Sequence, residues 1–516
     1  MKRNLQYILL LLIILGIATF FRFYNLDNIP PGIYPDEAIN ANQAISEPGK
    51  IFYAENNGRE GFFINLIYLS FSLFGISIWS LKFISALIGV LTVMGLYFLT
   101  KEILSRNIAL FSSFLLALSF WHINFSRIAF RAILVPFCLV FLFYFLFRGF
   151  RTKKLSNFIL SGLFFGLGFH TYIAFRLIVL LVLLILIPWW LIYKKEKQQK
   201  IFFIFIACWL SVTFLVALPI GIYFLNNPQD FMSRAGGVSV FSQDNPLLAL
   251  TKSSASHLLT FNFFGDFNWR HNISGKPVLF WPVGILFLIG LIFCIQKILK
   301  VFKDRNWSVE AEYWLLLSWW LIMLLPGALS FEGIPHSLRI IGAIPPVFIL
   351  AGIGGVFLWK KVKLLSKPKL PIWLIACLFI ILTTSFVYTQ YWRYFTLWGT
   401  NTEVEGAFAK NYVSIGNYLN SLPETTKKYV IVNQSGVLVK GIPMPAQTVM
   451  FIEKTKSKEI QTIYLLPENM DQIKIEKQGV IVLMRYDKNL FNQLLKRFPS
   501  GEIIQKNEVE IFKINH

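Results

Sequence analysis

Two adjacent carboxylates, Asp36 and Glu37, are the residues of this chain best suited to chemistry. They follow a first apolar stretch and the turn-forming segment Ile29-Pro30-Pro31-Gly32-Ile33-Tyr34-Pro35. Three prolines and a glycine predict a fixed turn that leads into a short helix. Ionisable groups this close to a bilayer are functional candidates by default, whereas two solvated loop acids that cap a helix are the alternative.

A second set of charged and aromatic residues lies between later apolar stretches. Arg127 and Arg131 are four residues apart, so in a local helix they would point the same way. The planar fork of arginine matches phosphate oxygens, which favours an anion site at the bilayer edge. Arginines that anchor the ends of spans are the alternative. The other members of this set are His170, Tyr172, Arg176, Glu332, His336 and Arg339.

The composition and the apolar stretches indicate a polytopic α-helical membrane protein. Of 516 residues, 55% are hydrophobic and only 15% are charged, whereas a soluble domain has roughly 25% charged residues. A membrane-spanning helix needs about 20 apolar residues. Eleven stretches qualify: 5–23, 82–100, 107–124, 133–147, 157–173, 177–192, 201–223, 278–296, 312–330, 338–358 and 371–389.

The distribution of basic residues predicts the orientation. Lysines and arginines gather in every second loop, which puts the N-terminus inside and the C-terminal segment outside the cytoplasmic membrane. The net charge of +22 follows from these loops and does not indicate a nucleic-acid partner. Phe62–Phe74 is too short to span and is expected to lie flat at the interface. We expect the first stretch to be a retained span, because no small-residue cleavage site follows it.

We therefore predict two domains. Residues 1–392 would form the transmembrane domain, with outer loops 24–81, which carries the acidic pair, and 224–277. Residues 393–516 would form a soluble extracytoplasmic α/β domain. Alternating and periodic patterns predict its strands near 428–434, 461–466, 479–485 and 508–514 and its helices at 405–422 and 489–498.

Several site classes find no support. The four cysteines all lie within predicted spans, and no Cys/His spacing indicates a metal site. A single divalent cation held by Asp36 or Glu37 together with a phosphate stays open. Gly236-Gly237 lacks the strand, lysine and spacing of a nucleotide-binding loop, so a soluble nucleotide-sugar donor is not expected.

Residues 1–360 carry a family resemblance. Pro35-Asp36-Glu37-Ala38 after the first span resembles the start of the GT-C superfamily of membrane glycosyltransferases. Within that superfamily this chain resembles the protein O-mannosyltransferases and the bacterial aminoarabinose and related transferases. Further similar stretches are Trp79–Gly89, Asn124-Phe125-Ser126-Arg127 and Pro335–Pro345. Gly58-Arg59-Glu60-Gly61-Phe62-Phe63 occupies the place where that group often has a His-Pro-Pro-Leu-like stretch, which this chain lacks.

The resemblance implies an enzyme that moves a sugar from a polyprenyl-phosphate carrier to a hydroxyl acceptor on the outer face, with inversion. Asp36 would be the general base, and Glu37 would raise its basicity or orient the acceptor. Whether the acceptor is a protein, a lipid or a glycan stays open. The residues implied for the donor phosphate are Arg127, Arg131, Arg176, His336 and Arg339, and those for substrate contacts are Tyr34, Arg59, Glu60, His170, Tyr172 and Glu332.

Two other classes compete with this interpretation. Transporters and lipid-linked sugar flippases often carry charges near the bilayer midplane, whereas the span interiors here are nearly free of charge. A binding protein anchored by its spans would not need eleven of them.

Overall fold

The computed structural model describes residues 2–304, 311–365, 371–457, 459–476, 478–506 and 509–515. Contacts within the chain divide it into two compact units. Unit 1 comprises Met1–Tyr24, Ser85–Arg127 and Arg131–Trp398. Unit 2 comprises Asn25–Ile84, Ile128–Phe130 and Gly399–His516.

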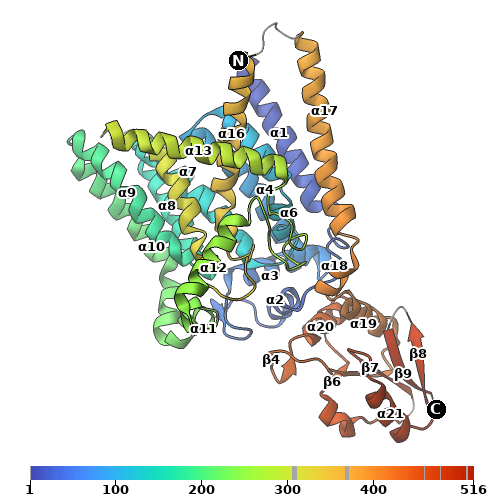
Figure 1. The fold of residues 1–516 in the computed structure, drawn as a ribbon. Helices are drawn as coiled ribbons and strands as arrows, with labels where there is room; N and C mark the ends of the chain where they lie inside the picture. Colours follow the sequence, from blue (N-terminus) through green and yellow to red (C-terminus); the bar gives the residue numbers. More distant parts are fainter. Residues whose placement is uncertain are drawn as a thin grey trace. The chain divides into compact units, whose positions relative to one another are not determined.

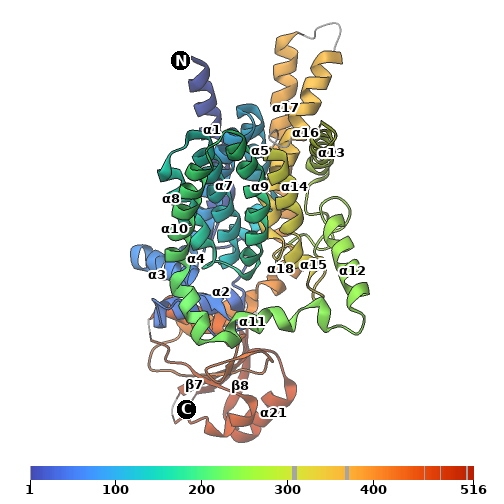
Figure 2. The ribbon, with the colours of Figure 1, turned by 90° about the vertical axis from the view of Figure 1, so that its left-hand side faces the viewer.

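Unit 1 is built from helices. Helices α7, α8 and α10 lie side by side (Figure 1; Figure 2). Helices α13 and α16 pack closely because glycines line their contact: a Cβ added to Gly290 would lie 1.8 Å from the Leu350 carbonyl oxygen. The main helices of this unit are α1 (Lys2–Phe23), most of α4 (Ile78–Ile103), α5 (Arg106–Ala117), α6 (Phe120–Phe125), α7 (Leu134–Thr152), α8 (Leu155–Gly168), α9 (Ile178–Lys195), α10 (Gln199–Asn226), α11 (Pro228–Gly237), α12 (Pro246–Leu259), α13 (Trp281–Asp304), α14 (Ala311–Ile322), α15 (Leu325–Ala328), α16 (Ile344–Leu365) and α17 (Ile372–Tyr391).

The predicted polytopic helical fold is confirmed. Eight helices of the described residues are long and apolar enough to cross a membrane. The third and fifth predicted stretches form the shorter helices α5 and α8, and the last stretch forms the 20-residue helix α17. Phe62–Phe74, which the sequence excluded as a span, is the 13-residue helix α3.

Unit 2 contains the loop of the acidic pair and the C-terminal α/β domain. The loop forms α2 (Pro35–Ser46), the short pair β1 (Phe52–Tyr53) and β2 (Arg59–Glu60), and α3. The C-terminal domain has a five-stranded sheet in the order β6-β3-β7-β9-β8, in which β3 pairs in parallel with both β6 and β7. Its elements are α18 (Thr402–Ala407), α19 (Lys410–Ser421), β3 (Lys427–Ile431), α20 (Ala446–Lys454), β6 (Ile463–Leu465), β7 (Gln478–Leu483), α21 (Lys488–Arg497), β8 (Gly501–Lys506) and β9 (Val509–Asn515).

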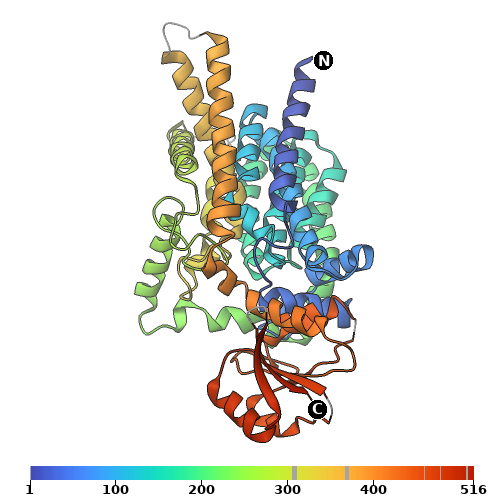
Figure 3. The same ribbon diagram turned by 90° about the vertical axis from the view of Figure 1, so that its right-hand side faces the viewer.

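Helices cover both faces of this sheet (Figure 1; Figure 3). Side chains alternate between the faces of a strand. Val430 and Val480 therefore point to one face of the sheet, where they pack with Leu419 of α19 and with α20. Ile431 packs on the other side with Phe491 of α21. The predicted strands near 428–434, 461–466 and 479–485 correspond to β3, β6 and β7. The fourth corresponds to β9, and its first residue, Glu508, lies outside the described residues.

The acidic-pair loop shares a core with the C-terminal domain. The Asn42 side-chain amide donates to the Gln447 carbonyl oxygen at 3.0 Å, and the Thr448 hydroxyl donates to the Ile33 carbonyl oxygen at 3.0 Å. The Phe71 and Phe451 rings stack with centroids 6.1 Å apart. Helix α2 is therefore held by α20, which lies far from it in the sequence.

At Gly32 the turn before Asp36 approaches the backbone of the C-terminal domain closely. Its φ of +87° suits glycine, and an added Cβ would lie 2.5 Å from the Phe408 carbonyl oxygen and 2.9 Å from the Lys410 backbone. Backbone atoms cannot rotate away, so only glycine fits here without a shift of the chain.

Gly32→Ala is expected to destabilise the protein by roughly 2–5 kcal/mol, the sum of a left-handed alanine and an overpacked contact. Gly49→Ala is the matched control, because Gly49 has a φ of +89° but an added Cβ would meet nothing within 4 Å. Thermal unfolding in detergent should show a clearly larger loss for Gly32→Ala. Equal melting temperatures for the two variants would disprove the close contact.

Candidate functional site

Glu37 is the buried member of the acidic pair. Pro35 begins α2, and the Glu37 side chain turns back over the first turn of that helix. Its Oε1 accepts from the Tyr34 backbone N–H at 3.2 Å, and its Oε2 accepts from the Ala129 backbone N–H at 2.7 Å. The side chain of Asn40, one turn further along α2, donates to the Ala129 carbonyl oxygen at 3.1 Å. Helix α2 therefore binds both polar groups of Ala129.

The charges around Glu37 partly offset one another. Burial raises the pKa of Glu37, and the charge of Asp36 adds to this, whereas the positive charge of Lys82 and the two backbone N–H donors lower it. Lys82 is itself fully buried, and its Nζ donates to the Pro30 and Gly32 carbonyl oxygens at 3.2 and 3.4 Å. The Lys82 ammonium therefore binds the turn that leads to Asp36.

Asp36 is the accessible member of the pair. It is only half-buried, and within the described residues its carboxylate accepts one hydrogen bond, from the Asn56 side-chain amide. A carboxylate with spare acceptor positions and access to solvent can take a proton from a bound hydroxyl. The two neighbouring acids therefore occupy different environments: the Glu37 carboxylate is hydrogen-bonded to the backbone, and the Asp36 carboxylate is partly accessible to solvent.

Three predicted substrate contacts lie in this loop. Arg59 is buried and donates to the Asn40 side-chain oxygen at 2.6 Å and to the Gln43 side-chain oxygen. Both acceptors belong to α2, so Arg59 stabilises this helix. The neighbouring Glu60 is buried as well, in β2. The Tyr34 ring meets the Phe130 ring edge-on at 6.4 Å. Arg59 thus fixes the helix that carries the acidic pair, and Tyr34 immediately precedes that helix.

In unit 1, the predicted arginines occupy different environments. Arg127 is fully buried, and its two terminal nitrogens donate to the Phe21 and Tyr24 carbonyl oxygens at 3.0 and 2.8 Å, so it binds the C-terminal end of α1. Arg131 is half-buried, with its guanidinium 5.5 Å from the centre of the Tyr172 ring. These two arginines, four apart in the sequence, thus have different partners.

The remaining predicted residues of unit 1 form separate contacts. Arg176 donates to the Phe231 carbonyl oxygen at 2.6 Å. The His170 Nε2–H donates to the Val216 carbonyl oxygen at 2.9 Å. Arg339 is nearly buried and pairs with the exposed Glu332 carboxylate at 3.0 Å.

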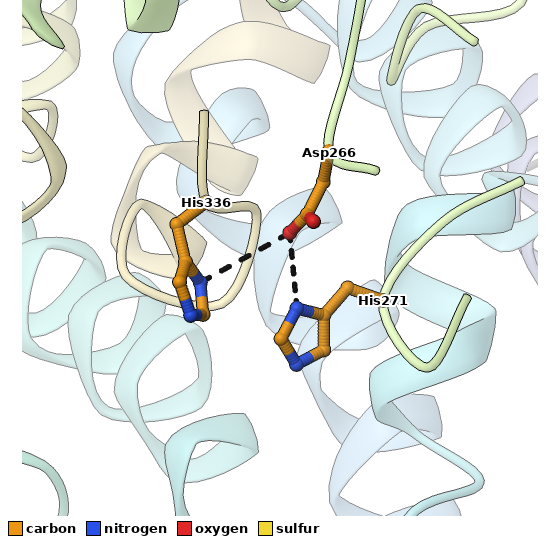
Figure 4. Close-up of side chains that lie close together, drawn as sticks. All are labelled: Asp266, His271 and His336. Carbon is orange, nitrogen blue, oxygen red and sulfur yellow. Dashed lines mark hydrogen bonds and ion pairs between the residues drawn. The ribbon is translucent and has the colours of Figure 1, made fainter. Parts of the chain in front are cut away.

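His336 belongs to a cluster that the sequence did not reveal. The Asp266 Oδ2 accepts from the His271 Nδ1 at 2.9 Å and lies 4.0 Å from the His336 Nδ1 (Figure 4). The same carboxylate accepts from the Ser337 and Asn268 backbone N–H groups, both at 2.8 Å. These bonds fix Asp266 between the two imidazoles.

The Asp266, His271 and His336 cluster has the donors of a metal site. One ligand atom from each residue lies within 4.8 Å of the others, and Asp266 and His271 are buried. One carboxylate and two imidazoles suit zinc, with a further position left for water or substrate. His336 stands far from the other two in the sequence, so no compact motif indicated this site.

Comparisons with known proteins agree with this fold. Residues 62–223 match the family model described as "Dolichyl-phosphate-mannose-protein mannosyltransferase". No curated protein matches the sequence. The structure is similar to that of ArnT from Cupriavidus metallidurans bound to undecaprenyl phosphate. The TM-score is 0.55, the identity is 12%, and 99% of this chain and 98% of that chain are covered.

Two further solved structures are similar. The apo state of the same ArnT has a TM-score of 0.54 at 11% identity, covering 99% of this chain and 98% of that one. The archaeal oligosaccharyltransferase AglB from Archaeoglobus fulgidus has a TM-score of 0.49 at 15% identity, covering 100% of this chain and 74% of that one. The predicted resemblance is confirmed at the level of the fold: this chain is an integral membrane protein whose fold is similar to that of ArnT.

Glu37→Gln is expected to lower stability by about 1–3 kcal/mol, because its amide would face one backbone N–H with another donor. The melting temperature in detergent measures this effect. Glu403→Gln, at an exposed position of the same unit, should leave the melting temperature unchanged. An equally stable Glu37→Gln protein would contradict the bonding seen at Ala129.

Protein purified without chelators is expected to carry about one zinc ion per chain, measured by mass spectrometry of the metal content. His271→Ala should lose the metal, because one of its three ligands is gone. His170→Ala, which removes a histidine outside the cluster, should retain it. A metal content that His271→Ala leaves unchanged would rule out this site.

Proposed function

We propose that this protein is a glycosyltransferase that transfers a sugar from a polyprenyl-phosphate carrier to a hydroxyl acceptor. The reaction would take place on the outer face of the cytoplasmic membrane, with the C-terminal domain outside. The observation that supports this most strongly is the division within the acidic pair. Both carboxylate oxygens of Glu37 accept hydrogen bonds from backbone N–H groups, whereas the half-buried Asp36 carboxylate can accept a proton from a substrate.

In the proposed reaction, the acceptor hydroxyl attacks the anomeric carbon of the sugar. Asp36 takes the hydroxyl proton as the new carbon–oxygen bond forms. The bond from the anomeric carbon to the phosphate oxygen breaks, and the lipid phosphate leaves with that electron pair. One direct displacement inverts the configuration of the sugar. Glu37 acts as a positioning residue, since it sets the first turn of the helix that carries Asp36.

The leaving phosphate gains negative charge, so fixed cations would lower the barrier. Arg131 is the foremost candidate, because its half-buried guanidinium lies against the Tyr172 ring, where it is partly accessible to a ligand. In the sequence, Arg127 and Arg131 flank Ala129, the residue that Glu37 and Asn40 bind. Arg127 would then act by fixing this segment. Arg176, His336 and Arg339 are proposed as further contacts of the donor phosphate.

The other predicted residues would shape the binding site. We assign Tyr34, Arg59 and Glu60 to the support of the acceptor side, beside the acidic pair. Tyr172 would orient Arg131, and His170 and Glu332 would contribute to the donor side. ArnT in its complex binds undecaprenyl phosphate, which agrees with a polyprenyl-phosphate donor for this chain.

Asp36→Asn is expected to lower transfer by at least about a hundredfold, the usual contribution of a general base, without loss of the fold. The measurement is transfer from radiolabelled polyprenyl-phosphate sugars in a membrane preparation. Asp27→Asn, at an exposed position of the same loop, is the matched control and should be fully active. Near-normal turnover of Asp36→Asn would refute the mechanism.

Arg131→Lys and Arg127→Lys are expected to fail in different ways. Lysine cannot reproduce the planar fork, so Arg131→Lys should raise the KM for the lipid donor about tenfold, equivalent to about 1.4 kcal/mol of binding, at an unchanged melting temperature. Arg127→Lys should lower the melting temperature, because two carbonyl oxygens lose their shared partner. The opposite pattern would reverse the two roles.

A further inference from the structure

The C-terminal domain contains a topological switch point. Strands β3 and β7 are parallel neighbours. After β3 the chain passes through α20 to β6, on one side of β3, whereas after β7 it passes through α21 to β8, on the other side of β7. In open α/β sheets, ligands bind at the carboxyl ends of strands where the connections diverge in this way.

A cavity of about 460 Å³ lies at this point, within the range of roughly 300–1,000 Å³ that is typical of ligand sites. Gln434, from the segment after β3, and Arg485 and Tyr486, from the segment after β7, line it. The Asn433 side chain ties these segments together: its amide donates to the Arg485 carbonyl oxygen at 2.7 Å, and its oxygen accepts from the Arg485 N–H at 2.9 Å. These two hydrogen bonds therefore hold the segments that line the cavity in place.

The lining combines a small apolar floor with a polar wall. Met484 and Val509 are buried members of the domain core and form part of the floor. The wall carries the amides of Asn411, Gln434 and Gln505. An amide group both donates and accepts hydrogen bonds, as the hydroxyl groups of a sugar do. Tyr486 adds an aromatic ring that is 59% exposed and is backed by the Phe491 ring at 5.8 Å.

The charges of the cavity favour a neutral ligand. Arg485 and Glu510 both line it and carry opposite charges. The adjoining N-terminus of α21 would otherwise attract an anion. The Asp487 carboxylate caps it, accepting from the Asn489 and Leu490 N–H groups at 2.9 and 3.1 Å. A phosphate or nucleotide would therefore meet a carboxylate at the position where such ligands usually bind.

We propose that this cavity is a saccharide-binding site of the C-terminal domain. The three side-chain amides would form hydrogen bonds with the hydroxyl groups of an uncharged sugar. The apolar face of that sugar would stack on the Tyr486 ring. The site is separate from Asp36 and its loop, and its existence does not depend on the transfer reaction proposed above.

The test is saturation-transfer NMR on the full-length protein in detergent, with maltotriose, α-1,6-mannotriose and chitotriose as probes. At least one of them is expected to bind. Gln434→Ala and Tyr486→Ala should each weaken that binding about fivefold or more, as the loss of one good contact does. Gln461→Ala is the matched control, because Gln461 is an exposed amide just before β6, at the opposite end of the parallel strands.

Melting temperatures are measured alongside, and all three variants should match the wild type because the altered side chains are not part of the core. Failure of all three trisaccharides to bind would overturn the proposal. So would binding that Gln461→Ala weakens as much as Gln434→Ala does. If a neutral peptide of Gly-Ser-Asn repeats bound in a Tyr486-dependent way and no trisaccharide did, the ligand class would be wrong.

Discussion

The bond between the Glu37 carboxylate and the Ala129 backbone N–H is the constraint on which the proposed site depends. A buried carboxylate is costly unless its oxygens are bonded and its charge is offset. Here the Tyr34 and Ala129 N–H groups satisfy both oxygens, and Lys82 supplies the opposing charge. The result is a rigid first turn of α2 that holds its neighbour Asp36 half-exposed. Glu37 therefore has a structural role, whereas Asp36 stays accessible for the proposed proton transfer.

Much of the fold could be predicted from the sequence, because bilayer thickness sets the length of apolar stretches and the central strands β3 and β7, buried on both faces, are short apolar runs. The misses have physical causes. The predicted helix at 405–422 divides into α18 and α19 at Ala409, whose φ is +53°. The short helix α20 and the strand β8 were not predicted, since their periodicity spans too few residues. The packing of α2 on α20 joins residues such as Asn42 and Gln447, and no local pattern reports contacts over such separations.

The candidate site was only partly predictable. The turn and the acidic pair stand out in the sequence because proline, glycine and adjacent carboxylates are rare together beside a span. The distinct environments of Asp36 and Glu37 depend on Ala129 and Asn56, which no spacing connects to them. The role of Lys82 could not be predicted either, because its place in the first turns of α4 does not show that its ammonium binds the turn before Asp36. Asp266 and His271 were missed because the third member of their cluster, His336, comes from another loop.

Chemical rescue tests the central claim, the division of roles between the two acids, most directly. Alanine in place of Asp36 leaves room for a small carboxylate from solution to serve as the base. Added formate should therefore restore part of the transfer activity of Asp36→Ala. It should not restore Glu37→Ala, in which the anchored helix turn itself is lost. Rescue of Glu37→Ala together with no rescue of Asp36→Ala would contradict the account.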